Sequence, residues 1–228
     1  MSDIDDKSID MILCDLPYGT TACKWDTVIP FEPLWAQYRR IAKKNAAIVL
    51  TASQPFTTAL IASNLANFRY SWVWEKTRGS NPYLANVQPL RCHEDVCVFG
   101  DRPRYYPQKT EGSSYTVSPK AGGRVASDER SNRAGFEGKV GSGRFPRSVV
   151  RLSNPSAEMG LHPTQKPVAL FEYLIKTYTN EGELVLDNCA GSGTTAIACL
   201  RTNRNYILIE QEGKYCDIAN KRIAEFTT

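Results

Sequence analysis

The sequence has only two histidines, and its seven cysteines include no C-x-x-C pair. A structural zinc site is therefore disfavoured, because Cys92 and His93 have no partners at the usual ligand spacing. The number of cysteines is odd, and Cys14 and Cys199 stand in apolar stretches. Reduced, buried thiols explain this usage better than a disulfide framework does, and they predict a cytoplasmic protein.

Long apolar runs are also lacking. No run approaches the roughly 18 residues that indicate a membrane span, and the first ten residues, MSDIDDKSID, are too acidic and polar for a secretory signal. The chain shows no internal repeat. Its 228 residues, 42% of them hydrophobic, predict one domain with a substantial core and room for an inserted lobe.

Positive charge is concentrated in one segment. Residues 101–151 hold eleven Lys and Arg against five Asp and Glu, a local balance of +6, so the rest of the chain carries −2 of the total +4. Seven of the fifteen glycines also fall in this segment, which shows no helical or strand period. We expect an irregular basic insertion that meets a polyanion.

The two ends of the chain alternate strand and helix patterns. Apolar runs predict strands over 8–15, 46–53, 68–76, 94–100, 184–186 and 205–210. Apolar stripes and proline starts predict helices over 31–44, 55–66, 167–179, 194–202 and 214–226. This alternation is typical of an open α/β sheet, divided here into residues 1–100, the insertion 101–151, and residues 152–228.

A glycine turn joins a strand to a helix in LVLDNCAGSGTTA, residues 184–196. Gly191 and Gly193 permit a sharp turn and close approach to a ligand, and Glu210 ends the next strand, where a carboxylate can bind ribose hydroxyls. The third glycine of a pyrophosphate-binding motif is missing, since Thr194 and Thr195 follow directly. The pattern favours a nucleoside-type cofactor over an ordinary turn with a surface acid.

Three motifs in a particular order extend this interpretation. DLPY (15–18) comes early, HPTQKP (162–167) comes late, and DNCAGSG (187–193) follows it. In this order the chain resembles the beta class of DNA adenine methyltransferases, within the N6/N4 DNA methylase family, over residues 8–100 and 160–226. The resemblance implies a Rossmann-like, S-adenosylmethionine-dependent methyltransferase sheet with circularly permuted motifs, acting on double-stranded DNA, without a metal.

The resemblance also implies residue roles. Asp15 and the carbonyl of Leu16 would accept the hydrogens of the adenine amine, Pro17 would shape the turn, and Tyr18 would stack on the extruded base. The implied cofactor residues are Asp15, Thr164, Lys166, Asp187, Ala190, Gly191, Ser192, Gly193, Thr194 and Glu210. The basic insertion would supply phosphate contacts, for which the candidates are Arg124, Arg130, Arg133, Lys139, Arg144 and Arg147.

The sequence departs from the family pattern at three places. Leu16 replaces a proline, and Cys189 replaces an aromatic residue. Only seven residues precede Ser8, where the family has a further strand and a Gly-Asp turn. We therefore expect either a sheet without one edge strand or a sequence that starts internally. An unpaired edge makes a homodimer an expectation as well.

Three other functions are weighed against adenine methylation. Methylation of the cytosine N4 amine is the nearest, but there the first motif position is more often serine than aspartate. A nicotinamide oxidoreductase would have the third glycine and no DLPY. An inactive nucleic-acid-binding relative would not need the intact Asp15, Tyr18, Gly191 and Gly193. Its biological role is left open between the host itself, a restriction-modification system, and a phage or another mobile element.

Overall fold

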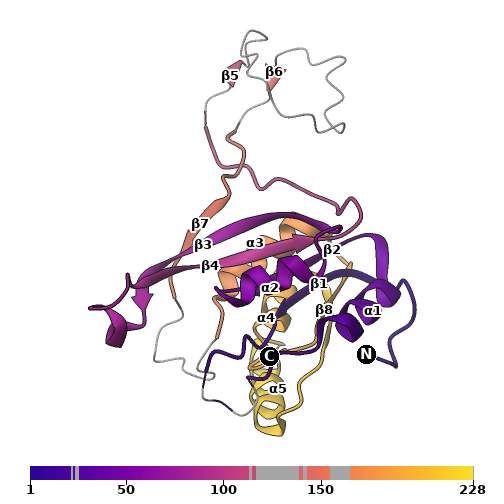
Figure 1. Ribbon diagram of the computed structural model, residues 1–228. Helices are drawn as coiled ribbons and strands as arrows, with labels where there is room; N and C mark the ends of the chain where they lie inside the picture. The colour runs from indigo at the N-terminus through magenta and orange to yellow at the C-terminus, as the bar shows by residue number, and fades with distance from the viewer. Residues whose placement is uncertain are drawn as a thin grey trace. The chain divides into compact units, whose positions relative to one another are not determined.

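The computed structural model describes residues 1–21, 23, 26–112, 115–116, 139–140, 143–154 and 165–227, with no side chains for 115–116 and 139–140 (Figure 1). The chain divides into two compact units. The main unit comprises Met1–Tyr106 and Arg147–Thr228, and the second comprises Pro107–Pro146. In the described residues no helix is both long enough and apolar enough to cross a membrane.

Seven of the described strands form one sheet in the main unit, in the order β7-β3-β4-β2-β1-β8-β9. β4 runs antiparallel to both of its neighbours, and the other neighbouring pairs are parallel. The strands are β1 (Ile9–Asp15), β2 (Ala42–Ala52), β3 (Phe68–Ser80), β4 (Arg91–Phe99), β7 (Val149–Leu152), β8 (Leu184–Asp187) and β9 (Asn205–Leu208). The predicted α/β sheet is confirmed, and its two central parallel strands, β1 and β8, come from opposite ends of the chain.

Helices cover both faces of this sheet (Figure 1). Along β1, Ile12 and Cys14 pack against one pair of helices, α1 (Phe31–Ile41) and α2 (Phe56–Ser63). Met11 and Leu13, which point the other way because strand side chains alternate, pack against α3 (Val168–Tyr178) and α4 (Thr194–Arg201). The last helix, α5 (Gly213–Thr227), lies against α4. The central strands are thus buried on both faces, as their continuous apolar runs indicate.

The structure corrects several element boundaries; β2, predicted over 46–53, begins already at Ala42, and α2, predicted over 55–66, ends at Ser63. The helix predicted over 31–44 ends at Ile41, because β2 begins at Ala42, which pairs with Ile9 of β1. β3 and β4 are longer than predicted, since they extend together as a hairpin that contains the 3₁₀ turn Pro82–Leu84. Residues 149–152, expected to be irregular up to residue 151, form β7 beside β3, where Trp74 Nε1 donates to the Leu152 carbonyl at 3.1 Å.

The second unit contains a short antiparallel ladder. β5 (Tyr115–Thr116) pairs with β6 (Lys139–Val140), and Thr110 forms a bridge with Arg144. Gly143 N also donates to the Gly112 carbonyl at 3.2 Å. The described parts of this unit therefore bring its two chain ends together.

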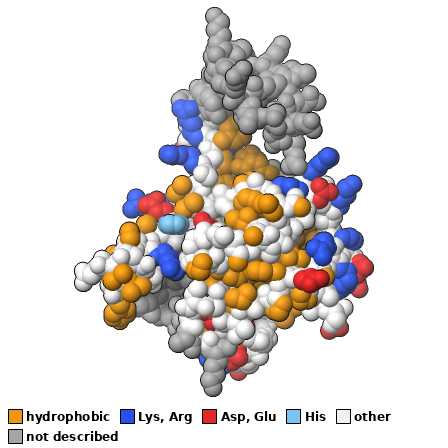
Figure 2. Space-filling view, in the orientation of Figure 1, with side chains coloured by type: hydrophobic (Ala, Val, Ile, Leu, Met, Phe, Trp, Pro, Cys, Tyr) orange, Lys and Arg blue, Asp and Glu red, His pale blue; other side chains and the backbone are white. Residues whose placement is uncertain are grey.

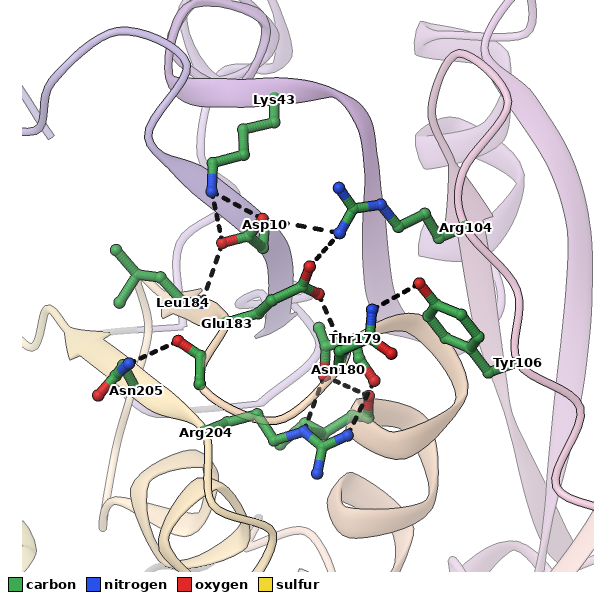
Figure 3. Close-up of polar contacts among 12 residues, drawn as sticks. Asp10, Lys43, Arg104, Tyr106, Thr179, Asn180, Glu183, Leu184, Arg204 and Asn205 are labelled. Carbon is green, nitrogen blue, oxygen red and sulfur yellow. Dashed lines mark hydrogen bonds and ion pairs between the residues drawn. The ribbon is translucent and has the colours of Figure 1, made fainter.

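A polar network ties the amino ends of the central parallel strands (Figure 3). The buried carboxylate of Asp10 accepts hydrogen bonds from Lys43 Nζ at 2.7 and 2.8 Å and from Leu184 N at 3.1 Å. Arg104 lies 3.8 Å from Asp10 and pairs with Glu183. Because Asp10 is the second residue of β1 and Leu184 is the first of β8, this network holds the two strands side by side at the edge opposite Asp15 and Asp187.

Candidate active site

A cavity of about 1530 Å³ opens at the carboxyl ends of β1 and β8. Parallel neighbours end at the same edge of a sheet, so Asp15 and Asp187 are brought to one place although 171 positions separate them in the sequence. The cavity is lined by all four predicted catalytic residues, Asp15, Leu16, Pro17 and Tyr18. It is also lined by the predicted cofactor residues Lys166, Asp187, Ala190, Gly191, Ser192, Thr194 and Glu210.

The Asp15 carboxylate is held by three donors. Tyr18 OH donates to Oδ1 at 2.8 Å, the Thr51 hydroxyl donates to the same oxygen, and Lys166 Nζ donates to Oδ2 at 2.7 Å. The side chain keeps 20% of its surface exposed toward the cavity. Asp15 is thus a fixed acceptor that faces solvent, unlike the mobile loop charge that an isolated aspartate would be.

Tyr18 is fixed on three sides. Its ring stacks on Phe56 with centroids 5.2 Å apart, and Lys166 Nζ lies 5.5 Å from the ring centroid. Its hydroxyl contacts Thr51 Oγ1 at 3.0 Å as well as Asp15. Burial and the nearby charges of Asp15 and Glu94 raise the pKa of Tyr18, so the hydroxyl keeps its proton and remains a donor.

Lys166 lies between two carboxylates. Its Nζ is 2.7 Å from Asp15 Oδ2 and 3.3 Å from Glu94 Oε2, and only 6% of the side chain is exposed. Glu94 pairs in turn with Lys76 at 2.5 Å. Burial alone lowers the pKa of Lys166, but the two carboxylates outweigh burial and raise it, so the ammonium stays charged. The row Lys76, Glu94, Lys166, Asp15 runs from β3 across β4 to β1.

The loop after DLPY is closed by Asp26. Its carboxylate accepts backbone N–H bonds from Gly19 and Thr20 at 2.9 Å and from Thr21 at 2.7 Å. Burial raises the pKa of Asp26, and these hydrogen bonds overcome that effect and lower it. Asp26 therefore shapes the backbone on one side of the cavity.

Asp187 is a buried acid at the bottom of the glycine loop. It is 2% exposed, accepts from Cys189 N at 3.0 Å, and accepts from the Thr195 hydroxyl. Its pKa is raised to about 6: burial is the main cause and the nearby charge of Asp15 acts in the same direction, while the two hydrogen bonds partly oppose them. An anion in so dry a place would gain from a cation bound in the cavity.

Glu210 is fastened to the same loop. Its Oε2 accepts from Gly191 N at 2.7 Å, and its Oε1 accepts from Gln211 N and Glu212 N, both at 2.9 Å. Ala190 N donates to the Ile209 carbonyl at 3.0 Å. The strand predicted over 205–210 ends at Leu208, and the Glu210 carboxylate, two residues beyond it, is fixed beside the turn.

Gly193 has a different place from the other loop residues. It does not line the cavity; instead, a Cβ built on it would meet the Cβ of Ala219 on α5 at 2.9 Å, and its φ is +79°. This glycine lets α4 and α5 approach each other closely. A cofactor contact by Gly193 stays a prediction.

The remaining predicted residues divide by what the structure describes. Thr164, Arg124, Arg130 and Arg133 lie outside the described residues, and the Lys139 side chain does so too. Arg144, in the Thr110 bridge of the second unit, and Arg147, at the start of the returning main-unit segment, are exposed. Contacts of these residues with nucleic acid stay predictions.

Sequence reasoning missed three residues of the site, Thr51, Lys76 and Glu94. It also missed the hydrogen bonds by which Asp26 holds the loop after DLPY. Glu94 had a signal, because it occupies an inward position in the period of β4, where a charge needs a partner. Its partners are not recognisable from the sequence, since Lys76 is on β3 and Lys166 is 72 residues away.

Comparison with known proteins agrees with this geometry. A family model described as DNA methylase matches residues 9–221. The type II methyltransferase M.HpaI of Haemophilus parainfluenzae is 26% identical over 244 residues, which cover 98% of this chain and 70% of M.HpaI.

Two solved structures share the fold. A crystal structure of an M1.HpyAVI–SAM complex is 24% identical, covers 94% of this chain and 89% of its own, and has a TM-score of 0.64. The PvuII DNA methyltransferase, described as cytosine-N4-specific, is 15% identical, covers 98% and 88%, and has a TM-score of 0.64. The motifs of this chain follow the order expected for the family, and the first and last of them line one cavity. The family match over most of the sequence shows that this chain belongs to the N6/N4 DNA methylase family.

Proposed function

We propose that this DNA methyltransferase transfers the methyl group of S-adenosylmethionine to the exocyclic N6 amine of adenine in double-stranded DNA, at a specific sequence. The observation that carries the proposal is the position of the Asp15 carboxylate, fixed by three donors, in the same cavity as the glycine loop. M.HpaI, named a type II methyltransferase, supports site-specific modification within a restriction-modification setting.

The residues around the glycine loop fit this cofactor. Glu210, fixed just beyond the end of β9, would bind the ribose, and Gly191, whose N–H donates to Glu210, lines the cavity without a side chain that would keep the ligand away. The buried Asp187, whose pKa is raised to about 6, is an anion at neutral pH that a nearby positive group would stabilise. S-adenosylmethionine supplies an electrophilic methyl group on a positively charged sulfur.

The residues around Asp15 fit the target amine. The amine lone pair is delocalised into the purine ring, so acceptors aimed at its hydrogens would favour a localised, nucleophilic form. Asp15 supplies one acceptor, and the carbonyl of Leu16 would supply the other. Lys166 and Thr51 hold the carboxylate in place, and the Tyr18 ring, backed by Phe56, offers a stacking surface for the base.

Adenine is favoured over cytosine by the aspartate that begins DLPY, where N4-cytosine enzymes more often have serine. The alternative, cytosine N4 methylation, is supported by the fold of the PvuII enzyme, which is described as cytosine-N4-specific. Mass analysis of nucleosides, from DNA of cells that express the chain, distinguishes the two products. N6-methyladenine is expected, and N4-methylcytosine alone would overturn the choice of base. Methylation-sensitive sequencing of the same DNA gives the target sequence.

The catalytic assignment is tested by Asp15→Ala. The variant should lose methyl transfer in single-turnover assays while calorimetry still detects cofactor binding, because Glu210 and the glycine loop are untouched. Turnover at the wild-type rate would refute the role of Asp15. Asp26→Ala, which alters the loop beyond the acceptor, should lower the rate without abolishing it.

A further inference from the structure

Exposed apolar side chains gather at the far end of the β3–β4 hairpin. Tyr83 is 98% exposed and Val87 83%, and Leu90 and Leu84 are also exposed. Four of the eleven large hydrophobic residues exposed in the described chain thus fall within eight positions. Figure 2 shows hydrophobic side chains at the left of the view, where Figure 1 places the end of β3 and β4. Such a cluster indicates a surface that meets a partner.

The hairpin end is an ordered turn. Leu84 N donates to the Asn81 carbonyl at 3.0 Å, and Val87 N and Gln88 N both donate to the Leu84 carbonyl at 2.9 Å. Below the turn, Ser80 Oγ donates to the Arg91 carbonyl at 3.0 Å. The backbone that carries the apolar side chains is therefore fixed by hydrogen bonds within the turn.

This turn belongs to the cavity that contains Asp15. Tyr83, Leu84 and Gln88 line that cavity. Between Glu75 and Glu94 the sequence has no acidic residue, while Arg78 is exposed and Arg91 lines the cavity. Exposed apolar side chains flanked by arginines are complementary to DNA, because its bases stack on the inside and its phosphates lie on the outside.

This inference rests on the proposed function. The target amine lies inside the DNA duplex until its base leaves the stack, and unstacking the base costs free energy. Proteins that open base steps do so by inserting apolar side chains between them. We propose that residues 81–90, with Tyr83 at their head, form a wedge that enters the base stack of double-stranded DNA and fills the space left by the extruded adenine. The occupant of this surface is thus the opened base stack beside the target.

Two duplexes of the target sequence test the wedge. In one the target adenine is paired, and in the other it stands opposite an abasic site, so that little remains to be opened. Tyr83→Ala should lower the single-turnover rate on the paired duplex by roughly 5- to 150-fold, the range that corresponds to loss of one aromatic stacking contact. On the abasic duplex the loss should stay within about twofold, because an unpaired base is already easy to extrude.

Two further variants complete the experiment. Tyr83→Phe keeps the ring and should lose much less than Tyr83→Ala. Leu65→Ala removes an exposed apolar side chain, 67% exposed, that does not line the cavity, and should match wild type on both duplexes. Equal losses of Tyr83→Ala on both duplexes, or no loss on the paired one, would overturn the wedge but leave the function standing. A wild-type protein that is inactive on both would refute the function itself.

Discussion

Replacing Asp187 by Asn should stabilise the protein in the absence of cofactor while weakening cofactor binding. Asp187 is almost completely buried, and burial raises its pKa from the ordinary value of 3.8 to about 6. At neutral pH the folded chain must keep this group charged in a dry environment, close to the charge of Asp15. Asn has nearly the same shape and can still accept the hydrogen bond from Cys189 N, but it carries no charge.

The magnitude follows from the pKa. Between pH 3.8 and about 6, folded Asp187 holds a proton that the unfolded chain has released, so the free energy of unfolding falls as pH rises through this window. Above pH 6 the penalty is complete and amounts to about 3 kcal/mol. Below pH 3.8 the group is protonated in both states, and the penalty vanishes.

Urea unfolding of both proteins between pH 4 and pH 8 measures this penalty. The difference in unfolding free energy, Asn variant minus wild type, should rise by about 2.4 kcal/mol from pH 4 to pH 7, because part of the penalty is already present at pH 4, and should stay level above pH 7. Changes in the hydrogen bonds to Cys189 and Thr195 add a constant, which does not alter the slope. A difference that does not vary with pH would refute the explanation, whatever its size.

Three further substitutions test other parts of the structure. Lys166→Met removes the cation between Asp15 and Glu94 and leaves Glu94 with Lys76 alone. It should lower stability by about 3 kcal/mol or more and reduce kcat, whereas Lys166→Arg should restore part of both. At Gly182 a new Cβ would enter open space, so Gly182→Ala should cost only the strain of φ +77°, about 1 kcal/mol in urea unfolding. Gly193→Ala also displaces α5 and should cost about 1–3 kcal/mol more. Equal costs for the two variants would contradict the packing role of Gly193. Asp10→Asn should lower unfolding free energy by about 1–3 kcal/mol at unchanged KM for the cofactor, and a raised KM would show that the amino-end network reaches the cavity.

Local patterns predicted the positions of the strands and of the acids that end them. Asp15 and Asp187 directly follow apolar runs, and parallel strands bring such ends to one edge, so the two motifs were expected to meet. The structure adds that the two strands are direct neighbours, β1 beside β8. The sequence was sufficient here because each feature depends on a contiguous stretch.

Features that depend on partners far away in the chain could not be predicted from the sequence. The end of α1 at Ile41 follows from pairing between Ala42 and Ile9, and β7 is only four residues long, too short for a period to show. Likewise, Glu94 reads as an isolated charge in a strand until Lys76 and Lys166 are placed beside it. Long-range pairing, rather than propensity, decided each of these.

The two central strands separate stability from chemistry. At their amino ends, Asp10 is buried with Lys43 and with the backbone of Leu184, an arrangement in which the charge is satisfied and holds β1 to β8. At their carboxyl ends, Asp187 is buried with too little compensation, and ionising it destabilises the fold. A bound cation would supply the compensating charge that Asp187 lacks. Relief of the free-energy penalty of its buried charge would therefore strengthen cofactor binding. Stabilising changes at the amino ends should therefore leave binding intact, whereas removal of the Asp187 charge gains stability only by giving up affinity.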